Sequence, residues 1–276
     1  MKTLIIGAKG MLGSMLAQVF SDWKPTAWDR AEVDITDLHD VREKLRALAP
    51  KVIINAAAYT DVDGAETQQE LAFAVNEGGV RNLAIVAKEI DATLIHYSTD
   101  YVFDGQKKEG YSENDSPGPA VNVYGQSKLA GERALVEIKP KFYLQRSAWL
   151  YGPGGKNFVD TMLEMGKTND NVTVVADQYG SPTFTKDLAL ATRALVSEKY
   201  PFGIYHSVNV GTASWFDFAN KIFQIKHMQV DAKPVNSTAF PRPARRPQWS
   251  VLLNENGPAM RPWEKALEEY LGPSEE

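Results

Sequence analysis

Residues 3–13 read Thr-Leu-Ile-Ile-Gly-Ala-Lys-Gly-Met-Leu-Gly. The short apolar run at 3–6 is typical of a strand buried in a parallel sheet. Residues 14–20 continue with apolar side chains at helical spacing, so the glycines lie between a first strand and a first helix. Glycine lets the backbone turn sharply and lets a diphosphate approach the free N–H groups at the helix start. This placement favours a dinucleotide site over a bare turn at Gly7, Gly10 and Gly13.

The pattern that follows repeats this alternation of strand and helix. Strands are expected near 26–28, at a short run ending at Asp34–Ile35, and near 51–55, 93–97 and 142–146. Helices are expected near 37–49, 70–89 and 121–130. Such alternation predicts an α/β fold with a Rossmann-type, doubly wound parallel sheet, which binds ligands beyond the carboxyl ends of its strands. Asn76 and Asn82 interrupt the helix at 70–89; either one of them is a buried structural hydrogen-bonding group near the site, or both are solvated.

The alternation becomes irregular after residue 150. We therefore expect a dinucleotide-binding domain over residues 1–150 and a smaller, irregular substrate-binding lobe over most of 151–276. Elements near 184–210 are expected to return to the first domain.

Composition excludes several classes of function. The 276 residues carry a net charge of −5 and no cysteine, which rules out disulfides and thiolate metal sites. The acidic balance gives no general attraction for nucleic acid or an anionic membrane. The first apolar run is too short for a signal peptide, and no stretch is long enough to span a bilayer, so a cytoplasmic protein is expected.

Residues at the ends of the second, third and fourth expected strands suit a cofactor. Asp29 lies close to the offset of about 20 residues at which an acid binds the adenosine ribose, whereas Arg30 would face a 2′-phosphate. The pair leaves NADH versus NADPH open. Asp34 and Ile35 would hold the adenine, or Asp34 serves a turn or helix cap. Small side chains after the strand at 51–55 leave room for a cofactor or allow tight helix packing, at Ala57, Ala58 and the following Tyr59.

The helix at 121–130 carries Tyr124 and Lys128 four residues apart, on one face. A free phenol titrates near pH ~10, and a nearby ammonium lowers that pKa toward the range useful for proton transfer. The spacing is common, so by itself it also fits an ordinary amphipathic helix. Thr99 follows the strand at 93–97, where its hydroxyl can bind a substrate carbonyl or cap a helix.

A basic loop lies at 242–247 in this acidic chain. Arg245 and Arg246 read either as part of a solvated, proline-rich loop or as an anion clamp for a diphosphate.

Together these motifs resemble an extended short-chain dehydrogenase/reductase, and more closely the dTDP-4-dehydrorhamnose reductase family. The resemblance runs nearly end to end. The glycine turn and the Tyr-x-x-x-Lys pair mark the superfamily, and the runs at 98–103 and 149–152 mark this branch. Further matching runs lie at 55–60, 122–128, 177–183 and 245–247.

The resemblance implies NADPH- or NADH-dependent reduction of the C4 ketone of a nucleotide-linked 6-deoxy sugar, dTDP-4-dehydro-L-rhamnose to dTDP-L-rhamnose. Tyr124 would be the proton donor, and Lys128 would bind the nicotinamide ribose and tune Tyr124. Thr99 would bind the carbonyl with Asp100 beside it, and Trp149 would pack against the sugar. The family's cofactor positions fall on Gly10, Met11, Leu12, Asp29, Asp34, Ile35, Ala57, Ala58 and Tyr59.

Assembly and metal use follow the family less closely. The resemblance leaves a homodimer open. Some relatives form a magnesium-bridged dimer through a glutamate shortly after the third glycine. Residues 14–16 here are Ser-Met-Leu, with no acid, so no metal is carried over.

Two rival functions share these features. One is a nucleotide-sugar epimerase or 4,6-dehydratase, but dehydratases need a second acid where this chain has Tyr101, and epimerases hold their cofactor tightly. The other is a non-catalytic partner resembling the regulatory subunit of methionine adenosyltransferase. The intact set of Thr99, Tyr124 and Lys128 favours the reductase over that subunit.

Overall fold

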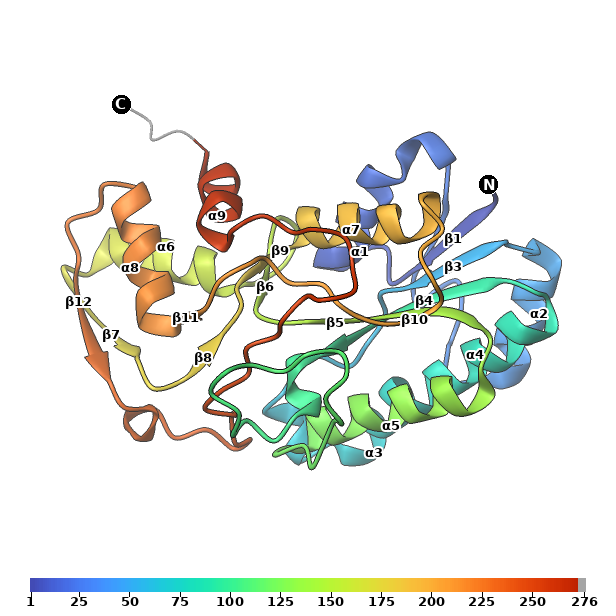
Figure 1. Cartoon of the computed structure of the whole chain (residues 1–276), viewed down its shortest axis with the longest axis horizontal. Helices are drawn as coiled ribbons and strands as arrows, with labels where there is room; N and C mark the ends of the chain where they lie inside the picture. The colour runs from blue at the N-terminus through green and yellow to red at the C-terminus, as the bar shows by residue number, and fades with distance from the viewer. Residues whose placement is uncertain (273–276) are drawn as a thin grey trace.

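A computed structural model describes residues 1–272, so the last four residues of the expected C-terminal lobe, 273–276, lie outside the described part. Its centre is a six-stranded sheet in the order β10-β5-β4-β3-β1-β2, with every neighbouring pair parallel (Figure 1). This confirms the Rossmann-type fold. The strands are β1 (Thr3–Ile6), β2 (Thr26–Trp28), β3 (Val52–Asn55), β4 (Thr93–Thr99), β5 (Lys141–Ser147) and β10 (Gly203–His206).

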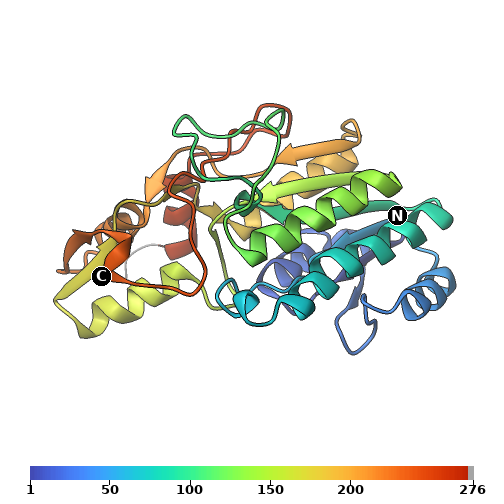
Figure 2. The ribbon, with the colours of Figure 1, turned by 90° about the horizontal axis from the view of Figure 1, so that it is seen from below.

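Helices cover both faces of this sheet (Figure 2). The alternation of side chains along a strand explains the two layers, since Leu4 and Ile6 enter one core and Ile5 enters the other. Each fully buried aliphatic side chain contributes about 1.5–3 kcal/mol. The first core holds α2 (Leu38–Leu48), α4 (Val80–Glu89) and α5 (Val123–Ile138); the second holds α1 (Met11–Val19) and α7 (Thr185–Ser197).

The helix expected at 70–89 is interrupted by a π-helical turn, η3 (Ala74–Gly79), between α3 (Gln69–Phe73) and α4. Asn76 lies in this turn and is buried. Its Oδ1 accepts a hydrogen bond from the Tyr59 amide at 2.9 Å, and its Nδ2 donates to the Tyr59 carbonyl and to Ser127 Oγ at 3.0 Å each. Asn82 donates to the Ile35 carbonyl at 2.9 Å. Both asparagines are therefore structural, and the π-turn sets Asn76 against the loop after β3.

The prediction of a strand that ends at Asp34–Ile35 is wrong, because this segment forms turns. Asp34 Oδ1 accepts hydrogen bonds from the amide and the hydroxyl of Thr36, at 3.0 and 2.7 Å. Such local bonds compete with a strand ladder. Asp37 caps α2 instead, accepting from the His39 amide at 2.8 Å.

A smaller lobe with its own core follows the sheet, built on α6 (Phe158–Thr168), α8 (Trp215–Ile225) and α9 (Trp263–Leu271). Three two-stranded pairs accompany it: β6 (Leu150–Tyr151) with β9 (Thr183–Phe184), β7 (Asn171–Val175) with β12 (Asp231–Val235), and β8 (Tyr179–Gly180) with β11 (Ala213–Ser214). Short 3-10 turns are η1 (Ser21–Trp23), η2 (Gly64–Glu66), η4 (Asp100–Val102) and η5 (Ser237–Ala239).

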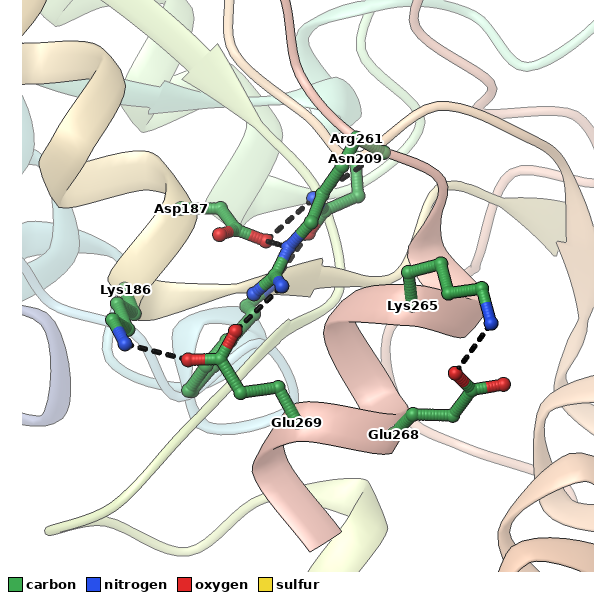
Figure 3. A network of polar contacts seen from close by, with 8 residues as sticks. Lys186, Asp187, Asn209, Arg261, Lys265, Glu268 and Glu269 are labelled. Atoms are coloured by element: carbon green, nitrogen blue, oxygen red, sulfur yellow. Dashed lines mark hydrogen bonds and ion pairs between the residues drawn. The ribbon is translucent and has the colours of Figure 1, made fainter. Parts of the chain in front are cut away.

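A charged network fastens α9 to the start of α7 (Figure 3). Asp187 accepts hydrogen bonds from Asn209 Nδ2 at 2.7 Å and from Arg261 Nε at 2.9 Å. Glu269, on α9, pairs with Arg261 Nη1 and Lys186 Nζ at 2.5 Å each. These pairs are partly exposed, so each is worth about 1 kcal/mol or less.

Among residues 1–272, no helix combines the length and the apolar character that crossing a bilayer requires.

Candidate active site

A cavity of about 900 Å³ lies at the carboxyl ends of the central strands. The wall of this cavity contains the residues expected to catalyse the reaction or bind the substrate: Tyr124, Lys128, Thr99, Asp100 and Trp149. The same wall contains every residue expected to bind the cofactor: Gly7, Gly10, Met11, Leu12, Gly13, Asp29, Arg30, Asp34, Ile35, Ala57, Ala58 and Tyr59.

The glycine turn has the shape that a diphosphate needs. Gly7 has φ +77°, and a Cβ there would lie 2.7 Å from the Ala57 amide nitrogen. A Cβ at Gly13 would lie 1.9 Å from the Gly7 carbonyl oxygen, so the helix packs directly on the turn. Gly10 is the N-cap of α1 and makes no side-chain cap, which leaves the first amides of the helix for an anion. These residues fit a dinucleotide.

Polar groups crowd the far end of the cavity. The Asp29 carboxylate accepts hydrogen bonds from the amides of Lys9 and Arg30 at 3.2 and 2.8 Å. Glu32 Oε2 accepts from the Asp29 amide at 2.7 Å. The Arg30 guanidinium is exposed and makes no hydrogen bond or ion pair with residues 1–272. The pKa of Asp34 is lowered, chiefly by the Thr36 hydroxyl.

The start of α5 positions Tyr124. Asn122 is the N-cap, and its Oδ1 accepts from the Gly125 amide at 2.7 Å. Its Nδ2 donates to the Arg245 carbonyl at 2.7 Å, which ties the helix to the basic loop. A Cβ at Gly125 would lie 2.3 Å from the Tyr101 carbonyl oxygen, so only glycine lets the helix approach the segment after β4.

Tyr124 meets Thr99 and Asp100 at the cavity wall. Thr99 Oγ1 donates to Asp100 Oδ1 at 2.8 Å. Burial raises the pKa of Tyr124, the Asp100 carboxylate raises it further, and a hydrogen bond with Thr99 opposes both. Burial also raises the pKa of Asp100 to about 6, opposed by Ser250 and Thr99. Tyr124 is therefore a protonated phenol at neutral pH, which is the form that an acid requires.

Lys128 is buried, and its ammonium is bound to β4. Nζ donates to the Tyr97 carbonyl at 2.6 Å and lies 3.4 Å from His96 Nε2. Burial lowers the pKa of Lys128 to about 8, opposed by the Glu132 carboxylate. Burial holds the pKa of His96 well below its usual range. The expected lowering of the Tyr124 pKa by Lys128 is wrong for this arrangement, because the ammonium bonds to the strand and burial dominates at the phenol.

Sequence reasoning missed some residues around this site. Tyr97 contributes a backbone carbonyl, which no residue type signals, and His96 read as an ordinary strand residue. Tyr97, Ser98, Ser147 and Lys156 also line the cavity. Ser147 could have been found from its place at the end of β5, next to Thr99 in register.

Arg245 and Arg246 line a different cavity, of about 780 Å³, together with Trp249. Arg246 makes a two-pronged ion pair with Asp63, Nη1 to Oδ1 at 2.5 Å and Nη2 to Oδ2 at 3.0 Å. The Arg245 guanidinium is exposed and makes no hydrogen bond or ion pair with residues 1–272. Tyr101 links residues of the two cavities, since it hydrogen-bonds to Arg246 and its ring lies edge-on to Tyr124, with centroids 6.0 Å apart.

Comparison with known proteins gives matches over almost the whole chain. The model of the RmlD substrate binding domain matches residues 1–275. A curated dTDP-4-dehydrorhamnose reductase from Streptomyces griseus is 41% identical, and the alignment covers 96% of this chain and 91% of that protein.

Solved structures agree. A dTDP-4-dehydrorhamnose reductase from Bacillus anthracis, crystallised with NADP, is 40% identical with a TM-score of 0.94, covering 98% of this chain and 99% of that one. A UDP-glucose 4-epimerase from Thermus thermophilus in complex with NAD is 19% identical with a TM-score of 0.76, covering 98% of this chain and 93% of that one; it shares the fold.

Proposed function

This chain belongs to the dTDP-4-dehydrorhamnose reductase family, and we propose that its larger cavity reduces the C4 ketone of dTDP-4-dehydro-L-rhamnose with NADPH or NADH to give dTDP-L-rhamnose. The protein is an NAD(P)H-dependent oxidoreductase. The observation that carries the proposal is the meeting of Thr99, Tyr124 and Lys128 with the glycine turn in one cavity.

The cofactor residues divide the cavity by chemistry. When bound, the reduced nicotinamide supplies the hydride. The turn at 7–13 and the amides that begin α1 hold its diphosphate. Asp29 and Arg30 face the adenosine ribose, and Lys128, whose ammonium has donors beyond the one given to Tyr97, binds the nicotinamide ribose.

The reacting oxygen is handled by two hydroxyls. As C4 accepts hydride, negative charge develops on the carbonyl oxygen, and fixed donors aimed at it are worth on the order of 3 kcal/mol each. In our proposal Tyr124 is one of those donors and gives its proton to the oxygen. Thr99 is the other, and its single hydroxyl proton turns from Asp100 Oδ1 to the substrate oxygen when the sugar binds. Asp100, which accepts the Thr99 proton in the structure, lies beside Thr99 at the edge of the proposed sugar site.

The nucleotide belongs in the second cavity. The exposed Arg245 guanidinium offers a charge for a diphosphate, and Arg246 is held by Asp63 behind it. Trp149 lines the larger cavity and packs against the sugar. The proposal keeps residues 1–150 as the dinucleotide-binding domain, with elements near 184–210 returning to it, and 151–276 as mainly the substrate lobe.

A homodimer and a cytoplasmic location complete the proposal, and both rest on the sequence and the resemblance. Light scattering on the purified protein tests the homodimer, and fractionation of the native cell tests the cytoplasmic location.

A coupled assay tests the reaction. The purified protein receives dTDP-4-dehydro-L-rhamnose and, in parallel, other nucleotide 4-keto-sugars, with NADH and NADPH in turn, and loss of the reduced nicotinamide is followed by absorbance. We expect turnover, with the dTDP sugar preferred. Cofactor binding without turnover of any keto-sugar would overturn the proposal in favour of a partner role, and tightly bound NAD in the purified protein would favour an epimerase.

A further inference from the structure

Trp149 has an unusual backbone for a residue with a side chain. Its φ is +47°, in the left-handed region that is uncommon for residues with a Cβ, and unlike Ala49 and Lys139 it does not end a helix. Trp149 lies two residues after the end of β5, and its carbonyl accepts a hydrogen bond from the Thr183 amide at 3.2 Å. Residues held this way gather at functional sites. The conformation turns the Trp149 side chain into the wall of the larger cavity.

A second tryptophan lies flat against the first. The rings of Trp149 and Trp215 are 3.5 Å apart between centroids with 5° between their planes. Free aromatic pairs prefer offset or edge-on contacts with centroids 4.5–7 Å apart, so this face-to-face arrangement is imposed by the fold. Phe158 packs on Trp215 with centroids 4.6 Å apart and 49° between planes. Trp215 and Phe158 lie outside the cavity wall.

Gly180 makes room for the edge of the Trp149 ring. A Cβ at this position would lie 2.4 Å from Cε2, 2.6 Å from Nε1 and 2.8 Å from Cζ2 of the indole. The indole is therefore covered on one face by Trp215 and bounded along one edge by Gly180. The uncovered side belongs to the cavity, and Trp149 remains partly exposed there.

The neighbouring elements fix Trp215 in this place. It is the first residue of α8 and lies inside a capping box, in which Ser214 Oγ accepts from the Asp217 amide at 3.1 Å and the Asp217 carboxylate accepts from the Ser214 amide at 2.9 Å. Strand β11, which ends at Ser214, pairs antiparallel with β8, which ends at Gly180 (Figure 1). The pairing of β11 with β8 therefore positions both Trp215 and Gly180, the two residues that pack against the Trp149 indole.

We propose that Trp215 is a positioning residue for the sugar site, which holds the Trp149 indole so that its free face forms a rigid apolar wall for the pyranose ring of the nucleotide sugar. This inference rests on the proposed function. Sites need a supporting layer that locks the side chains in contact with the ligand. A flat apolar face matches the C–H face of a sugar ring, and rigid placement orients C4 toward the hydride donor and Tyr124.

The test compares Trp215→Ala, Trp215→Phe and a control, Trp23→Ala, at a tryptophan of η1 on the other side of the fold. We expect Trp215→Ala to raise KM for the dTDP keto-sugar by about 10-fold or more, with the Kd for NADPH within about 2-fold of the parent. Trp215→Phe keeps a flat ring and should recover most of the loss, and Trp23→Ala should leave both constants unchanged.

Circular dichroism supplies a readout independent of turnover. Two stacked indoles couple their transitions, so the parent protein should show an exciton couplet that Trp149→Phe and Trp215→Phe both remove and Trp23→Phe keeps. Gly180→Ala should weaken the couplet and raise the same KM. A folded Trp215→Ala protein with unchanged KM and kcat for the keto-sugar would overturn the inference, as would a couplet unaffected by Trp215→Phe. Failure of the parent protein to reduce any keto-sugar would instead overturn the proposed function, while the couplet still tests the pairing.

Discussion

The ammonium of Lys128 donates a 2.6 Å hydrogen bond to the backbone carbonyl of Tyr97. Lys128 lies on α5 and Tyr97 on β4, so one buried bond joins the helix that carries Tyr124 to the strand that ends at Thr99. The two hydroxyls proposed to meet the substrate oxygen are thereby held in a fixed relation, which is the condition for electrostatic stabilisation without reorganisation.

We expect activity to fall as the pH rises above about 8. Burial lowers the pKa of Lys128 to about 8, so the ammonium loses its proton, and with it the charge proposed to bind the ribose, as the pH passes that value. Three other ionisable groups face Lys128: His96, held neutral by burial, the Glu132 carboxylate and Tyr124. The pH profile of kcat/KM for NADPH measures the effect. Residual activity of Lys128→Met should be lower and should lack this limb; the same limb in that variant would assign it to another group.

Tyr124→Phe should lower kcat by about 10³-fold, within the range for loss of a general acid, and leave the Kd for NADPH nearly unchanged. The phenyl ring keeps the packing but has no proton to give. Tyr101→Phe is the matched control for kcat and should keep kcat near the parent value, because Tyr101 lies edge-on to Tyr124 and outside the wall of the larger cavity, and its hydroxyl bonds to Arg246 in the second cavity. Stopped-flow turnover and cofactor fluorescence titration measure the two constants. Near-normal kcat in Tyr124→Phe would remove it from the acid role.

Asp100 should make folding stability depend on pH with a defined sign. In the folded protein the pKa of Asp100 is raised to about 6 from 3.8. Its contribution to the free energy of unfolding is therefore fully present below pH 3.8 and is lost as the pH rises through about 6. The free energy of unfolding of Asp100→Asn, relative to that of the parent, should therefore rise by about 2–3 kcal/mol between pH 4 and pH 7. Urea unfolding at a series of pH values measures this gain.

Asp115→Asn is the control of opposite sign for that experiment. The Lys107 ammonium holds the pKa of Asp115 below its usual value, so its contribution is lost as the pH falls. Asp115→Asn should lose stability relative to the parent as the pH rises. An Asp100→Asn difference that is flat from pH 4 to pH 7 would contradict the buried environment assigned to Asp100.

Arg30→Ala should weaken the use of NADPH more than the use of NADH. The Arg30 guanidinium is exposed and, within residues 1–272, makes only a charge interaction with Asp34, so in our proposal it can bind a 2′-phosphate, whereas Asp29 would face a ribose hydroxyl. We expect KM for NADPH to rise by about 10-fold and KM for NADH to change by less than about 2-fold. Asp29→Asn should have the larger effect on NADH. Equal changes for both cofactors in Arg30→Ala would place the guanidinium away from the phosphate.

Short-range signals in the sequence determined the nucleotide-binding half of the molecule. The glycine spacing, the alternation of apolar runs and helical patterns, and the Asn122 cap act through sterics and hydrogen bonds within a few residues, so they can be read without the fold. They singled out the residues expected to bind the cofactor, together with Thr99, Tyr124 and Lys128, and all of these line one cavity. The same local reading failed at residues 33–35, where side-chain bonds of Asp34 replace a strand.

Tertiary structure alone decided how these groups are held and what surrounds them. Trp215 stacks on Trp149, which lies 66 positions earlier in the sequence. Asn76 lies in a π-helical turn and hydrogen-bonds to Tyr59, and Arg245 lines a second cavity. Lys128 bonds to a backbone carbonyl, which every residue possesses and no residue type marks. Contacts between distant segments depend on the packed geometry of the sheet and lobe, and burial, not spacing, sets the pKa values of Tyr124 and Lys128.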